Sequence, residues 1–204
     1  MVTIRIEPGA FLELIRAGWE VDHRESIGIL FGHTIKRHNL VYVVETVHPS
    51  QRALRLPTEA KLDGKSKQRC YWTLDTVEHI LGLFHTHHGY WNSKGKQRAA
   101  PLFSKEDHVD YFENEADYVE LVLAYNHINS YRYPHHTSTT LSGTHIFDDQ
   151  VNEVETEPLL PKRYHIRIVG YYWEKSTGNR GGRAKRAKLD IEERVLREFF
   201  KKPR

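Results

Sequence analysis

Residues 80–88 have the sequence Ile-Leu-Gly-Leu-Phe-His-Thr-His-His. The first five form a continuous apolar run of strand length, which is typical of a strand buried on both faces. Side chains at positions i and i+2 of a strand project from the same face, so His85 and His87 can both reach one metal ion while Thr86 points away. The stretch therefore predicts a buried strand whose end could carry half of a metal site; the alternative is that an H-x-H pair arises by chance in a chain with 14 histidines.

The sequence on either side of this stretch predicts a mixed α/β domain. Apolar side chains recur at helical spacing over 7–19 and again over 189–200, and a third helix is expected to open at Ser104. Other short β-rich runs predict four further strands, at 26–32, 40–47, 118–125 and 164–173. Polar segments predict an irregular connection over 48–69, a loop over 89–101, and a loop or edge hairpin over 129–144. Strands and helices do not alternate regularly, which favours a mixed α+β domain over a doubly wound one.

Length and composition indicate one folded domain and exclude several other classes. The chain has 204 residues, of which 39% are hydrophobic and 28% charged, so collagen-like and disordered proteins are excluded. The single cysteine, Cys70, cannot close an intramolecular disulfide, and the first residues do not form the core of a signal peptide. The longest apolar runs are far shorter than the roughly 20 residues that cross a bilayer. We expect a cytoplasmic protein.

Charge is distributed unevenly along the chain. Residues 175–204 contain 11 Lys and Arg against 4 Asp and Glu, a net charge of +7, whereas residues 1–174 have a net charge of −4. We therefore expect a domain over 1–174, followed by a basic linker and C-terminal helix over 175–204. The basic run Arg180–Lys188 can bind phosphates nonspecifically, although such a run is more often solvated or packed by its own helix.

Two further elements carry groups that could complete a metal site. Ser104-Lys105-Glu106-Asp107 has the pattern of a helix start, in which the serine caps the helix and acidic residues occupy its first turn. Capping places Asp107 one turn into the helix, where its carboxylate could be a third zinc ligand. Glu25 precedes the apolar run at 26–32, and its alternative interpretation is an ordinary surface glutamate.

Three separated segments resemble the JAMM motif of the JAB/MPN metalloprotease family, in which an upstream glutamate is followed by H-x-H and then by S-x-x-D. They are Glu25-Ser26-Ile27-Gly28-Ile29-Leu30-Phe31-Gly32, Gly82-Leu83-Phe84-His85-Thr86-His87 and Ser104-Lys105-Glu106-Asp107. The resemblance covers roughly residues 2–128. It implies the cytidine-deaminase-like fold of that family, a central mixed β-sheet flanked by helices.

The chain departs from the family pattern between the second and third segments. Residues 88–103 make a longer connection than the family usually has, and His88 replaces the usual proline. A longer loop adds little closure entropy, so the insertion is geometrically tolerable. It leaves Asp110 as an alternative to Asp107 for the third ligand.

The resemblance also implies the chemistry. One Zn²⁺ per chain would be held by His85, His87 and Asp107, with water as the fourth ligand. Glu25 would accept the proton of that water and pass it to the leaving amine, and the Ser104 hydroxyl would stabilise the oxyanion. The non-catalytic scaffold branch of the family lacks these residues.

Members of the family remove ubiquitin or ubiquitin-like modifiers, which implies a deubiquitinase-like isopeptidase or peptidase. The expected partners are a ubiquitin-like modifier or its conjugate and E1/E2-like conjugation enzymes, and no membrane. Tyr90 and Trp91, in the insertion, are candidates for substrate contact; the alternative for this segment is a solvated loop.

Two other functions stay open at this point. A peptidase for a sulfur-carrier protein would use the same site on a different β-grasp substrate. A RadC-like, nucleic-acid-associated or non-catalytic interaction module is the less favoured alternative. DNA binding should depend steeply on salt and be lost when the chain stops at Lys175, whereas peptidase activity should survive that truncation and vanish in Glu25→Gln.

Overall fold

A computed structural model describes the part of the chain that positions the predicted metal site. The described residues are 1–19, 25–50, 54–56, 59–61, 79–92, 95–97, 99–102, 118–127, 138–140, 143–148, 164–174, 183–192 and 194. Within them the chain forms the helix α1 (Pro8–Trp19), a further helical residue at Arg194, inside the helix expected over 189–200, and fourteen strands. The strands are β1 (Val2–Ile6), β2 (Ile27–Lys36), β3 (Leu40–Pro49), β4 (Leu54–Leu56), β5 (Glu59–Lys61), β6 (Ile80–His88), β7 (Tyr90–Asn92), β8 (Gly95–Gln97), β9 (Val119–His127), β10 (Ser138–Thr140), β11 (Gly143–Asp148), β12 (Tyr164–Glu174), β13 (Arg183–Arg186) and β14 (Lys188–Ile191).

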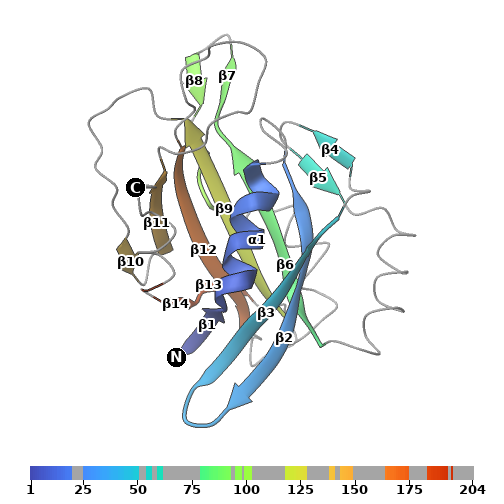
Figure 1. Cartoon of the computed structure of the whole chain (residues 1–204), viewed down its shortest axis with the longest axis vertical. Coiled ribbons are helices and arrows are strands. Elements are labelled where there is room, and N and C mark those ends of the chain that lie inside the picture. Colours follow the sequence, from blue (N-terminus) through green and yellow to red (C-terminus); the bar gives the residue numbers. More distant parts are fainter. Residues whose placement is uncertain are drawn as a thin grey trace.

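Ten of these strands form one mixed sheet. Nine follow the order β10-β11-β12-β9-β6-β2-β3-β1-β14, and β13 pairs with β12 (Figure 1). The pairs β6–β9, β1–β3 and β1–β14 are parallel, and the other pairs of this sheet are antiparallel. The expected mixed α/β class is compatible with this architecture. The described part of the chain is nevertheless mostly strand, and its sheet is barrel-like and nearly closed.

Residues 183–191 connect β12 to β1, the two parts of the sheet that approach each other as it curves. β13 pairs antiparallel with β12, the Ala187 amide then donates to the Gly170 carbonyl of β12 at 2.9 Å, and β14 pairs in parallel with β1. Leu189 and Ile191 are buried in the main core. The expectation of a linker and the start of a helix is therefore wrong for these residues. The division of the chain at residue 174 stays a prediction, and residues 195–200 lie outside the described part.

Because β13 and β14 belong to the sheet, a truncation at Lys175 does not test DNA binding by the basic side chains alone. Such a truncation removes both strands, exposes one edge of β1 and takes buried apolar side chains out of the core. Loss of DNA binding after truncation would then report damage to the domain as well as loss of basic side chains. Two of the basic side chains in this region, Lys185 and Arg183, form ion pairs with Glu174 of β12. Hydrogen bonding from Lys185 lowers the pKa of Glu174.

Helix α1 confirms the helix expected over residues 7–19, and it lies against one face of the curved sheet (Figure 1). Its apolar stripe of Phe11, Leu14 and Ile15 is fully buried in the main core. Near its C-terminal end, the Tyr125 hydroxyl donates to the Ile15 carbonyl at 3.0 Å. A Cβ at Gly18 would lie 2.2 Å from the ring of Tyr125, so this close approach requires glycine.

The other predicted elements have mixed outcomes. The strands expected over 26–32, 40–47, 80–84, 118–125 and 164–173 are confirmed as β2, β3, β6, β9 and β12. In the segment 129–144, expected to be a loop or edge hairpin, the described residues 138–140 belong to β10 and 143–144 begin β11, and these two strands pair at one edge of the sheet. The loop expected over 89–101 is wrong, because β7 and β8 form a separate antiparallel hairpin there, which projects beyond the ends of β6 and β9 (Figure 1). The helix expected from Ser104 lies outside the described residues.

Among the described residues, no helix combines the length and apolar character needed to cross a membrane.

The burial of Leu189 predicts that β14 contributes strongly to stability. Leu189→Ala removes a side chain that is 1% exposed, and it should lower the free energy of unfolding by about 2–5 kcal/mol through lost burial and a residual cavity. Urea unfolding of the purified chain measures this change. Lys188→Ala, on the exposed neighbour, should change it by less than about 0.5 kcal/mol. Equal effects of the two substitutions would contradict the placement of β14 in the core.

Candidate metal centre

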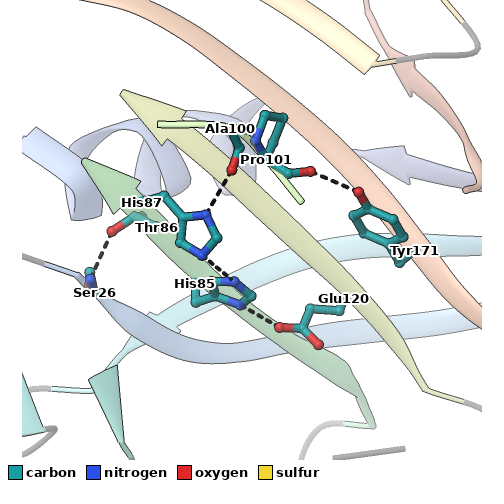
Figure 2. Close-up of polar contacts among 8 residues, drawn as sticks. All are labelled: Ser26, His85, Thr86, His87, Ala100, Pro101, Glu120 and Tyr171. Atoms are coloured by element: carbon teal, nitrogen blue, oxygen red, sulfur yellow. Dashed lines mark hydrogen bonds and ion pairs between the residues drawn. The ribbon is translucent and has the colours of Figure 1, made fainter. Parts of the chain in front are cut away.

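The end of β6 presents two histidines on one face of the sheet. His85 and His87 project together while Thr86 points to the opposite side, as the two-residue period of a strand predicts (Figure 2). On that opposite side, Thr86 Oγ1 accepts the backbone N–H of Ser26 at 2.7 Å, and the Thr86 amide donates to the Ser26 carbonyl at 2.8 Å. The strand therefore holds the imidazoles on one face and is tied to the residue after Glu25 on the other.

The Nδ1 atom of each imidazole is hydrogen-bonded to a different acceptor. Nδ1 of His85 is hydrogen-bonded to the carboxylate of Glu120, which comes from β9, the parallel neighbour of β6. Nδ1 of His87 donates to the backbone carbonyl of Ala100 at 2.8 Å. The two Nε2 atoms then face each other, 3.0 Å apart, with the ring centroids separated by 4.8 Å (Figure 2).

The two Nε2 atoms are close enough to share a proton or a metal cation. A backbone carbonyl only accepts hydrogen bonds, so Nδ1 of His87 carries the proton and its Nε2 presents a lone pair. The carboxylate of Glu120 favours the same tautomer for His85. Two lone pairs at this separation repel unless a proton or a metal cation lies between them. Nitrogens bound tetrahedrally to one zinc at about 2.0–2.1 Å lie roughly 3.3 Å apart, so the two rings fit zinc.

The pairing of β2 with β6 leads back toward Glu25. Ile27 is the register partner of His85, and the Ser26–Thr86 hydrogen bonds extend the pairing by one residue. Continuing the same register by one more residue would place Glu25 opposite His87. Glu25 is partly buried, and of the predicted site residues the structure brings His85 and His87 together.

Three side chains of the sheet fix the segment 99–101 over this face. Asn126 accepts the Ala99 amide hydrogen at 2.8 Å and donates its own amide to the Ala99 carbonyl at 2.9 Å. His87 binds the carbonyl of Ala100, and the buried Tyr171 hydroxyl of β12 donates to the carbonyl of Pro101 at 2.7 Å (Figure 2). The chain is therefore held at three consecutive residues, shortly before Ser104.

The remaining predicted site residues have different positions. Ser104, Asp107 and Asp110 lie outside the described residues, so their place in the site stays a prediction. Tyr90 and Trp91 lie on β7, where they pair in register with Gln97 and Lys96. Within the described ranges, no group of three or more His, Cys, Asp or Glu residues could hold a metal.

His88, which stands where the family usually has proline, does not join the candidate ligands. It lies on the Thr86 side of β6, buried, and its ring stacks on Tyr125 with centroids 4.9 Å apart and planes 9° apart. This packing is continuous with the contact between Tyr125 and α1. His88 thus belongs to the core that supports the end of β6.

Sequence reasoning missed Glu120, Asn126 and Tyr171. Glu120 had a readable signal, because it is the one charged residue in the apolar run 119–125, and a buried carboxylate needs a partner. Asn126 and Tyr171 had no such signal in the sequence, because they form hydrogen bonds with backbone groups of 99–101, which are distant from them along the chain.

Comparison with known proteins assigns the chain to a class. A family model described as prokaryotic homologs of the JAB domain matches residues 7–134, more than half of the chain. The protein therefore belongs to the prokaryotic JAB family, which confirms the expected JAB/MPN domain. No curated protein matches the chain. A solution structure of a protein from Desulfitobacterium hafniense aligns with 94% of this chain and 93% of its own at 14% identity, with a TM-score of 0.49.

The fixation of segment 99–101 predicts a measurable cost when Asn126 is lost. Asn126→Ala leaves both backbone groups of Ala99 without this partner and should lower the free energy of unfolding by about 1–3 kcal/mol. Chemical denaturation measures the loss. His33→Ala is the matched control, because it removes only an exposed pair with Glu45 and should have an effect below about 0.5 kcal/mol. Similar losses in both variants would refute the anchoring role of Asn126.

Proposed function

We propose that this chain is a zinc-dependent metallopeptidase or isopeptidase of the JAMM type. Its substrate would be the peptide or isopeptide bond after the C-terminus of a ubiquitin-like β-grasp protein. Membership of the JAB family supports the type of site but does not by itself imply catalysis. The further support comes from the side chains at the end of β6.

The observation that carries the proposal is the pair of facing Nε2 atoms, 3.0 Å apart on His85 and His87. Both rings are oriented from the Nδ1 side by acceptors, as ligating histidines usually are in metalloproteins. A histidine pair with a purely structural role would have no need for such preorganisation on both rings. His85, His87 and Asp107 are the proposed ligands of one zinc ion.

The catalytic roles follow from where each group is held. When bound, zinc supplies Lewis acidity and makes water a stronger acid. Glu25, which precedes the start of β2 by two residues, would accept the proton of the attacking water and deliver it to the leaving amine. The Ser104 hydroxyl donates to the oxyanion that develops at the cleaved carbonyl. The segment 99–101, anchored through Asn126 and Tyr171, leads the chain toward Ser104.

The hairpin of β7 and β8 supports the proposed class of substrate. β7 begins two residues after His88, so the hairpin borders the metal centre. The hairpin is a sheet of two strands, and each strand therefore has one edge that no described strand covers. An extended C-terminal tail can add to such an edge through main-chain hydrogen bonds. Tyr90 and Trp91 on β7 are the proposed contacts for that tail.

Among the residues that the structure describes, the basic run offers little support for nucleic acid as the substrate. Within the described residues, part of the basic run is built into β13 and β14, where Lys185 and Arg183 pair with Glu174. A sulfur-carrier protein is a second β-grasp substrate for the same site. Fusions to a modifier and to a sulfur carrier distinguish the two.

The proposed centre predicts about one zinc per chain. Elemental analysis of the purified chain, incubated with zinc and then desalted, should find this content. The double variant His85→Ala, His87→Ala should lose the zinc because both described ligands are gone. His33→Ala, which removes an exposed histidine of β2, should retain it. Absence of zinc from the unmodified chain, or equal zinc in the double variant, would overturn the proposal.

The role of Glu25 predicts that catalysis and metal binding can be separated. Glu25→Gln removes the base but keeps the size of the side chain, so kcat on linear β-grasp fusions should fall about 100-fold or more. Mass spectrometry of the cleaved fusion gives the rate and the bond that is cut, and zinc content should be unchanged. The control Glu45→Gln, an exposed carboxylate on β3, should keep the full rate. Full activity of Glu25→Gln would exclude Glu25 as the base.

A further inference from the structure

We infer that Glu120 is a positioning residue of the metal centre. Its carboxylate accepts the Nδ1 proton of His85 and so fixes both the tautomer and the ring orientation that leave Nε2 for zinc. This inference rests on the proposed function, because it requires a metal at His85 and His87. It assigns a role to a residue outside the three motif segments on which that function is built.

The position of Glu120 is unusual for a carboxylate. It is 2% exposed and lies on a strand whose neighbours Val119, Leu121 and Val122 are buried apolar residues. Taking a carboxylate out of water costs several kcal/mol unless a partner compensates it. An apolar residue would avoid that cost in the core of the sheet, so the carboxylate indicates a requirement other than stability.

The register of the parallel pair β6–β9 aims Glu120 at His85. Glu120 is the register partner of Leu83, two residues before His85 on the same face of β6. Val122, the partner of His85 itself, is apolar and fully buried. The long side chain of Glu120 therefore reaches along the face to the ring of His85 from below, on the Nδ1 side, as Figure 2 shows.

The two candidate ligands differ in what holds them. His87 is oriented by a neutral backbone carbonyl, that of Ala100. His85 is oriented by a buried carboxylate, which adds negative charge behind the ring and raises the basicity of its Nε2. Glu120 thus contributes charge to the centre without being a ligand, and His85 is the ligand whose affinity for zinc depends on a side chain.

Two substitutions test this role on the full-length chain. Glu120→Gln keeps the size of the side chain but removes the charge, and its amide can also donate to Nδ1 and so favour the wrong tautomer. Glu120→Leu removes the hydrogen bond altogether. Competition with a chromophoric chelator should show zinc bound 10- to 100-fold more weakly by both variants. Val169→Ala, which removes buried volume from β12 on the same face, is the control for general destabilisation and should bind zinc within about threefold of the unmodified chain.

A second measurement reads the tautomer directly and does not depend on stability. Long-range ¹H–¹⁵N NMR spectra of metal-free, histidine-labelled protein should show His85 protonated at Nδ1 in the unmodified chain. Glu120→Gln, the variant of unchanged size, should lose or mix this tautomer, and Val169→Ala should keep it.

The outcomes separate this inference from the function on which it rests. If the unmodified chain binds no zinc, the proposed function fails and the role of Glu120 fails with it. If the unmodified chain binds zinc and both Glu120 variants bind it within threefold with the His85 tautomer unchanged, the inference is overturned while the zinc site stands. Weaker zinc binding together with a changed tautomer supports it.

Discussion

The two-residue period of β6 orders both the candidate site and the core beneath it. It sends His85 and His87 to one face of a buried strand and Thr86 and His88 to the other. On the first face, the rings meet acceptors that aim their Nε2 atoms at each other. On the second, Thr86 holds the start of β2 through Ser26, and His88 packs on the tyrosine that contacts α1. One strand thus connects the candidate site to the core.

The anchoring of segment 99–101 explains how the domain accommodates a long insertion. The chain leaves the sheet after His88, forms the hairpin β7–β8 and returns to be fixed by Asn126 and Tyr171. Both His88 and the segment 99–101 are therefore held by the sheet, and the hairpin between them adds length without separating these two points.

The sequence predicts those parts of the fold in which the pattern of apolar residues is strong. The helix over residues 8–19 and the strands β2, β3, β6, β9 and β12 follow directly from apolar spacing. The hairpin β7–β8 does not, because its three-residue strands are too short to show an apolar pattern and are defined by pairing with each other. Residues 188–191 alternate exposed and buried side chains, a strand period, but the apolar residues further along also match helical spacing.

The candidate site shows the same division between local and long-range information. Local spacing was sufficient to predict that His85 and His87 share a face. Glu120 lies 35 residues from His85, and its pairing with that histidine depends on β9 lying parallel to β6, which a single sequence does not reveal. Residues predicted from the family motif alone, Ser104 and Asp107, stay predictions.

The pairing of β1 with β14 also constrains how the protein is made. Arg5 and Asp190, which face each other across these strands, are separated by 185 residues along the chain. During synthesis, β1 emerges from the ribosome long before its second partner exists, and one edge of it stays uncovered until residues 188–191 follow. Closing contacts of such high sequence separation is slow. The barrel-like sheet is therefore completed only after residues 188–191 have been translated. Until then, the unpaired edge of β1 is exposed to mispairing in the nascent chain.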